Sequence, residues 1–292
     1  MPLGKERKET NAKDLYRRLE QDFIKPGMND DWARYMVNSS ELLCPEFKAR
    51  SMGLVCDFTD HVSRIFSAVF PSTRTMQYVV DSGAEESMLF VHHPMIWDIR
   101  KAPDVFIDMD KDLLNEFRRR KISIYCLHVP LDDYGEFSTS VNLAKALRIK
   151  PVRSFAPYYG AMAGVFGETE LTTTEDLLTN LSHAIGHEAR LYGYGSSESK
   201  DKKVAVIAGG GNDAVFLSEI ASAGVSVLIT GITVKSDYSR TAHELAAAKE
   251  INVIGGTHYS TEKFACMSMV SYFSRLGLAA QFVDDEPVLE DM

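Results

Sequence analysis

Short apolar runs alternate with helix-length segments over most of the chain, and this alternation constrains the fold more than any other feature. Such alternation is typical of parallel sheets that are covered by helices. We therefore predict an α/β fold. The predicted strands are 88–91, 122–127, 204–208, 225–230 and 251–255, and the predicted helices are 111–120, 140–147, 213–223, 240–249 and 261–276.

The parts of the chain outside this pattern suggest the domain organisation. Residues 12–24 have the apolar spacing of an amphipathic helix. Residues 151–200 are less regular, with prolines and glycines that suggest a crossover between two lobes. The acidic tail 284–292 is expected to be a solvated end. The expected divisions are an N-terminal extension with one helix at 1–34, a first lobe at 35–150 plus 256–292, and a second lobe at 151–255.

The bulk composition excludes several classes of protein. The net charge of -9 argues against nucleic-acid and anionic-membrane binding, because both depend on clustered Lys and Arg. No run approaches the roughly 18 to 20 apolar residues that span a bilayer. The 4 cysteines have wide, irregular spacings and are expected to be reduced thiols. We expect a cytoplasmic protein.

Histidines stand directly after three of the predicted strands. The carboxyl ends of parallel strands meet at one edge of a sheet, where ligands bind in α/β folds. These histidines, with the carboxylates that follow them closely in sequence, are His92, His93, His128, Asp132, His258 and Glu262.

Imidazole and carboxylate groups in this number suit divalent metals. The set is larger than one ion needs, and either Glu262 or Asp132 can bridge two ions about 3.5–4 Å apart. The adjacent His92 and His93 would point to opposite faces of a regular strand, so they converge only if the strand ends at them. Pro94 is consistent with such an end. A lone histidine at a strand end is more often a packing residue, but three such segments together favour a metal site.

Glycines accompany two of these segments. Gly255 and Gly256 permit a sharp turn that delivers His258. Residues 209–211 are glycines that follow a predicted strand and open a helix. They match neither the P-loop nor the dinucleotide-binding pattern, so a tight strand-to-helix turn is favoured over a phosphate cradle.

The motifs Phe90–Pro94, His128–Asp132 and Gly256–Glu262, together with Asn142, resemble the GTP cyclohydrolase 1 type 2 family, also called the NGG-interacting-factor-three-like proteins. The resemblance covers roughly residues 35 to 285. It implies two lobes, each a mainly parallel sheet with flanking helices, and a dinuclear metal site in the cleft between them. The ligands it implies are His92, His93, Asp132, His258 and Glu262, with Glu262 contacting both ions and His128 as a further ligand or a close neighbour.

The resemblance also implies a function. It suggests a metal-dependent hydrolase that opens the purine ring of GTP, or hydrolyses another nucleotide or phosphoester, through hydroxide held at two divalent ions (Zn, Fe, Mn, Co or Ni). Glu262 and His128 are the expected catalytic acid or base. The expected partners are a small-molecule substrate, which a nucleotide would fit, and further copies of the chain in a ring-shaped hexamer. The alternative is a non-catalytic role in regulation, metal storage or metal delivery through a protein partner.

Overall fold

The computed structural model describes residues 10–101 and 105–292 and divides the chain into two compact units. The first unit comprises Met1–Leu131 and Cys266–Asp285, and the second comprises Asp132–Ala265 and Glu286–Met292. Residues 1–9 of the predicted N-terminal extension lie outside the described residues. Among the described residues, none of the helices combines the length and the hydropathy that a bilayer-spanning helix needs.

The first unit is built on a five-stranded sheet with the order β15-β4-β5-β8-β2. The strands β15, β4, β5 and β8 are parallel to their neighbours, and β2 pairs antiparallel with β8. Two small antiparallel pairs, β1 with β3 and β6 with β7, accompany it. The strand bounds are β1 Thr10–Asn11, β2 Gly53–Cys56, β3 His61–Val62, β4 Ile65–Ala68, β5 Ser87–Val91, β6 Ile96–Trp97, β7 Phe106–Ile107, β8 Ile122–Cys126 and β15 Ala280–Phe282.

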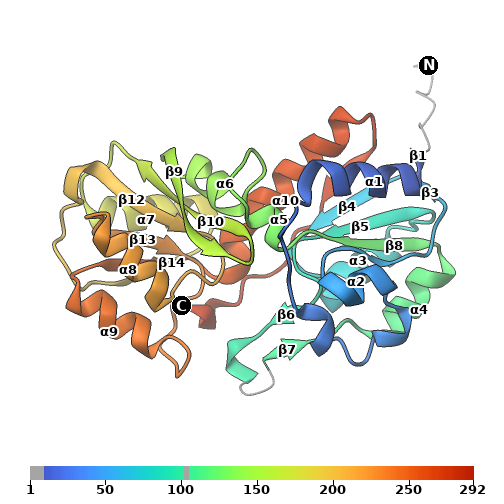
Figure 1. The fold of residues 1–292 in the computed structure, drawn as a ribbon, viewed down its shortest axis with the longest axis horizontal. Helices are drawn as coiled ribbons and strands as arrows, with labels where there is room; N and C mark the ends of the chain where they lie inside the picture. The colour runs from blue at the N-terminus through green and yellow to red at the C-terminus, as the bar shows by residue number, and fades with distance from the viewer. Residues whose placement is uncertain (1–9, 102–104) are drawn as a thin grey trace. The chain divides into compact units, whose positions relative to one another are not determined.

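Helices cover both faces of this sheet (Figure 1). On one face, side chains of β4, β5 and β8 share an apolar cluster with α2, α3 and α4. On the other, Tyr125 of β8 stacks on Tyr16 of α1, and Phe90 of β5 packs against Phe273 of α10. The helix bounds are α1 Ala12–Phe23, α2 Pro45–Arg50, α3 Thr73–Asp81, α4 Lys111–Arg119, α5 Val129–Asp132, of which Asp132 belongs to the second unit, and α10 His258–Arg275, which belongs to the first unit only from Cys266 onward. The 3-10 helices are η1 Trp32–Tyr35, η2 Ser40–Leu42 and η3 Ile99–Lys101.

The second unit is built on a six-stranded sheet with the order β11-β14-β13-β12-β10-β9. Only β12, β13 and β14 are mutually parallel, whereas β11, β10 and β9 join by antiparallel pairing. The sheet is therefore mixed, and the prediction of a mainly parallel sheet was wrong for this unit. The strand bounds are β9 Lys150–Tyr158, β10 Ala161–Glu168, β11 Arg190–Tyr192, β12 Lys203–Ile207, β13 Val227–Thr230 and β14 Asn252–Gly255.

Alternating side chains divide the core of the second unit between the two faces of its sheet. Val204 and Val206 of β12 pack with α6 and α7. Ala205 and Ile207 point the other way and pack with α8 and α9. The helix bounds are α6 Thr139–Ala146, α7 Thr174–Ile185, α8 Ala214–Ser222 and α9 Arg240–Ala248, and the 3-10 helices are η4 Lys200–Lys202 and η5 Leu289–Asp291.

Residues 151–200 are not a crossover between lobes. They supply the β9–β10 hairpin, helix α7 and strand β11. Two prolines of β9 misled the prediction, because proline is tolerated in an edge strand and β9 is the edge. Residues 132–150, 256–265 and 286–292, expected in the first lobe, lie in the second unit. The reason for the first of these is that α6 packs on β10 and β12.

Candidate metal centre

His92 and His93 stand where strand β5 stops. The strand ends at Val91, and the backbone amides of His92 and His93 donate to the carbonyls of Ala68 and Val69, at 3.2 and 2.9 Å. The two imidazole rings lie on one side, with their centroids 4.3 Å apart. The expected convergence of adjacent histidines at a strand end is therefore present.

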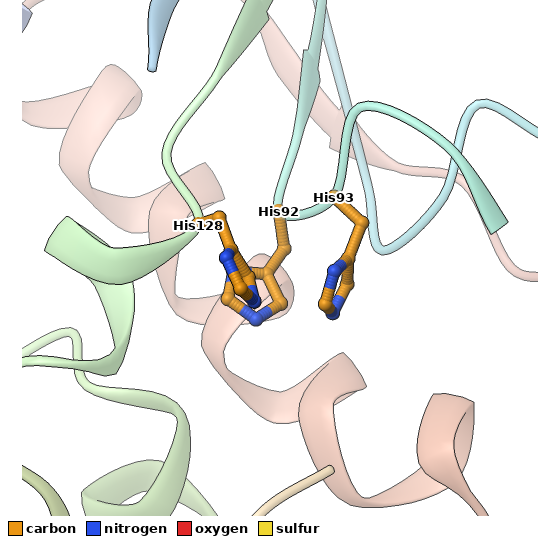
Figure 2. Close-up of side chains that lie close together, drawn as sticks. All are labelled: His92, His93 and His128. Atoms are coloured by element: carbon orange, nitrogen blue, oxygen red, sulfur yellow. The ribbon is translucent and has the colours of Figure 1, made fainter. Parts of the chain in front are cut away.

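His128 joins them from the end of the neighbouring strand β8. Figure 2 shows the three side chains extending from the ends of β5 and β8 with their rings close together. Each of the three is buried, and one nitrogen from each lies within 4.8 Å of the others, which is a separation that one metal ion can span. Because β5 and β8 pair in parallel, their carboxyl ends meet at the same edge of the sheet.

The tautomer of His92 suits metal binding. Its Nδ1 lies 3.0 Å from the carbonyl oxygen of Leu127. A carbonyl oxygen only accepts, so Nδ1 carries the hydrogen and donates it. The neutral ring then has its lone pair on Nε2, which is the form and the orientation by which histidine usually ligates a metal.

The second unit holds another candidate pair at the start of helix α10. His258 Nε2 and Glu262 Oε1 lie 3.2 Å apart, one helical turn from each other, and both side chains are buried. The preceding Thr257 has a φ of 64°, which is unusual for a β-branched residue. The left-handed residue that delivers His258 is thus Thr257, whereas Gly255 and Gly256 are not among the residues with positive φ.

The glycine turn after β12 lies against this pair. Gly209 has a φ of 71°, and a Cβ placed on it would overlap Oε1 of Glu262 and lie 3.2 Å from Cδ2 of His258. Its amide donates to Thr261 Oγ1 at 3.0 Å, which fixes the turn on the first turn of α10. The turn is tight, as predicted, and it also makes room for the Glu262 carboxylate.

Asp132 ends the short helix α5 and is buried. Its Oδ1 accepts a hydrogen bond of 2.8 Å from Thr139 Oγ1, which orients the carboxylate. A ligand role for Asp132 stays a prediction.

Two groups of contacting residues were missed by the sequence analysis. Asp30 and Trp32 contact Nδ1 of His128, at 2.6 and 2.9 Å. Asp291, in the tail that was expected to be solvated, is buried, and its Oδ2 accepts the backbone amide of His258 at 3.0 Å. No periodicity or local motif marks these residues, because each acts across a long stretch of sequence.

His243 is a buried histidine of the second unit that belongs to no such group. Its Nδ1 contacts the Tyr194 hydroxyl at 2.8 Å, and its Nε2 donates to the carbonyl of Thr233 at 2.9 Å. Burial lowers the pKa of His243 below its usual value, so the ring is held neutral by its surroundings.

Comparison with known proteins agrees with this architecture. The GTP cyclohydrolase 1 type 2 homolog of Pyrococcus abyssi is 31% identical over 238 residues, which is 80% of this chain and 89% of that protein. The homolog of the same name from Deinococcus radiodurans is 26% identical over 234 residues, or 80% and 84% of the two chains.

Solved structures share the fold at lower identity. Protein ybgI, of unknown function, matches with a TM-score of 0.74 and 20% identity over 96% of this chain and 100% of that one. Reduced HcgD from Methanocaldococcus jannaschii matches with a TM-score of 0.68 and 20% identity over the same shares. The family model described as Duf34/NIF3 (NGG1p interacting factor 3) matches residues 42–286. The chain therefore belongs to the Duf34/NIF3 family.

Proposed function

We propose that this protein binds two divalent metal ions and uses them in hydrolysis. The observation that carries the proposal is the group of three buried histidines, His92, His93 and His128, at the carboxyl ends of parallel strands. Three imidazoles gathered away from water are costly unless they ligate something or hydrogen-bond fully. The further ligands that we propose are Asp132, His258 and Glu262.

The donor set fits such ions. Imidazole nitrogen and carboxylate oxygen suit Zn, Fe, Mn, Co and Ni, and His92 has the tautomer that a ligand requires. None of the 4 cysteines forms a disulfide, and none belongs to a candidate metal-binding group in the described residues. A structural zinc site is usually thiolate-rich and closed, so this set favours a site with positions open to water or substrate.

Bound divalent ions would supply a water of lowered pKa and polarise the substrate. Of the two roles open to His128, ligand and proton carrier, its position beside His92 and His93 supports the ligand role. Glu262 is the better candidate for moving a proton, because its carboxylate faces His258 at 3.2 Å and is buried. The relatives' shared name makes GTP the first substrate to try, with release of formate as the signature of purine-ring opening.

The decisive test of metal binding is elemental analysis of untagged protein beside a His93→Ala/Glu262→Ala variant. We expect about two metals per chain in the parent and a large loss in the variant. The matched control is His183→Ala/Glu188→Ala, which makes the same changes at exposed positions of the second unit. A parent that stays without metal after reconstitution with Zn, Mn and Fe(II) would refute the proposal.

Turnover is tested separately from binding. Metal-loaded protein is expected to release formate from GTP, or to hydrolyse a member of a nucleotide and phosphoester panel, and Glu262→Gln is expected to abolish this. Tightly bound metals without turnover on any of these substrates would favour the second candidate, a regulatory, storage or delivery protein. The ring-shaped hexamer is part of the same proposal, and light scattering of the purified protein measures it.

A further inference from the structure

Asp30 and Trp32 reach the histidine group from a segment that precedes the family-matched region, residues 42–286. Oδ2 of Asp30 lies 2.6 Å from Nδ1 of His128, and Nε1 of Trp32 lies 2.9 Å from the same nitrogen. These contacts join residues 98 and 96 positions apart in the sequence. Asp30, Trp32 and His128 are all buried.

The segment is fixed in place by its own contacts. The amide of Ala33 donates to Ser51 Oγ at 2.8 Å, and the amide of Asp31 donates to Asp30 Oδ1 at 2.8 Å. The indole of Trp32 meets the rings of His93, His128 and Phe106 edge-on, with centroids 5.5, 5.2 and 5.1 Å apart. The indole therefore covers two of the three histidines.

Asp30 and Trp32 make opposite demands on Nδ1 of His128. A carboxylate only accepts a hydrogen bond, whereas an indole N–H only donates one, so Nδ1 cannot serve both. If Nδ1 carried no hydrogen, its lone pair would repel that of Asp30 Oδ2 across the 2.6 Å that separates the two atoms. The hydrogen therefore lies between Nδ1 and Asp30, which leaves the lone pair of His128 on Nε2.

We propose that Asp30 is a positioning residue of the metal centre, which holds His128 in the tautomer and orientation that present Nε2 to a metal. The inference rests on the proposed metal binding. A carboxylate behind a ligating histidine fixes its ring and raises its basicity, and losing such a partner typically weakens metal affinity about 10- to 100-fold. The extension before the family region thus contributes to the site itself.

The first readout uses metal-free protein, so it does not depend on metal binding. Nitrogen-15 NMR of the His128 ring tells which nitrogen bears the hydrogen. We expect the hydrogen on Nδ1 in the parent and in Trp32→Phe. In Asp30→Asn, the neutral amide is a weaker acceptor than the carboxylate, so the Trp32 N–H can donate to Nδ1 instead. The hydrogen of the His128 ring is then expected to shift toward Nε2. The reverse pattern, with Trp32→Phe altering the tautomer and Asp30→Asn leaving it unchanged, would overturn the proposal.

The second readout is metal affinity, measured by competition with a chromogenic chelator. Asp30→Asn is expected to lower the affinity for Zn or Co(II) about 10- to 100-fold while its thermal unfolding in chelator stays close to that of the parent. The matched control is Asp31→Asn, since the Asp31 side chain is partly exposed and pairs with Arg34 at 2.5 Å. If Asp30→Asn bound the metal as tightly as the parent, the positioning role of Asp30 would be refuted and the proposed metal binding would stand. If the parent itself bound neither metal, the proposed function would be refuted.

Discussion

Replacing Gly209 by alanine is expected to strain the backbone and to displace the Glu262 carboxylate, and a second glycine with a similar φ allows the two effects to be separated. Gly209 has a φ of 71°, where an L-residue costs about 1–2 kcal/mol. The stiffer unfolded chain offsets about 0.4–1 kcal/mol of that cost. The added Cβ would also overlap Glu262 Oε1 and lie 3.1 Å from its Cδ, so the carboxylate must move by about 1 Å. Overpacking of this kind typically adds about 1–3 kcal/mol.

The matched control is Gly224→Ala. Gly224 has a φ of 69°, and a Cβ there meets no atom within 4 Å. Urea unfolding in chelator is expected to show a loss of roughly 1 kcal/mol for Gly224→Ala and about 2–4 kcal/mol for Gly209→Ala. Metal affinity, from chelator competition, is expected to fall about 10-fold or more in Gly209→Ala alone, because a ligand displaced by 1 Å no longer fits. If Gly209→Ala bound metal as tightly as Gly224→Ala, the reasoning that this turn positions Glu262 would be refuted.

Two further predictions follow from groups described above. Asp291→Ala removes the carboxylate that accepts the hydrogen bond of the His258 amide, so it is expected to lower the free energy of unfolding in urea by about 1 kcal/mol, as loss of a helix cap does. The control is Glu290→Ala at an exposed position, which is expected to have little effect. Equal losses in the two variants would contradict a capping role for Asp291. Burial lowers the pKa of His243, so below about pH 6.5 the unfolded chain binds a proton that the folded chain resists, and stability falls as the pH falls. Between pH 7.5 and pH 5.5, His243→Gln is expected to lose less stability than the parent. The control is His183→Gln at an exposed position, which is expected to follow the parent. A parallel decline of the parent and His243→Gln would show that burial of the His243 ring does not cause the pH dependence.

The elements that the sequence predicted correctly are those with a clear apolar run or a clear apolar periodicity. β5, β8, β12, β13 and β14, and helices α4, α6, α8 and α9, lie within a few residues of the expected positions. Each buries several apolar side chains, and such a pattern can be recognised from the local sequence. The short strand β4, Ile65–Ala68, was not predicted, because four residues that include Ser67 carry too little pattern.

The candidate site was partly predictable for a similar reason. Parallel strands bring their carboxyl ends to one edge, so histidines after β5 and β8 had to be neighbours. Asp30 and Trp32 were beyond reach, because a contact across almost 100 residues depends on how a loop closes rather than on local pattern. The positive φ of Thr257 was equally hidden, since threonine rarely adopts it and tertiary contacts impose it.

Strand β9 has a consequence for how copies of this chain can associate. It is the last strand of its sheet, and it carries proline at positions 151 and 157. Proline has no amide hydrogen, so an incoming strand would find two missing donors along this edge. Exposed strand edges are templates for aggregation, and proline is one of the devices that blunt them. Continuation of the sheet from one copy into the next is therefore disfavoured at β9.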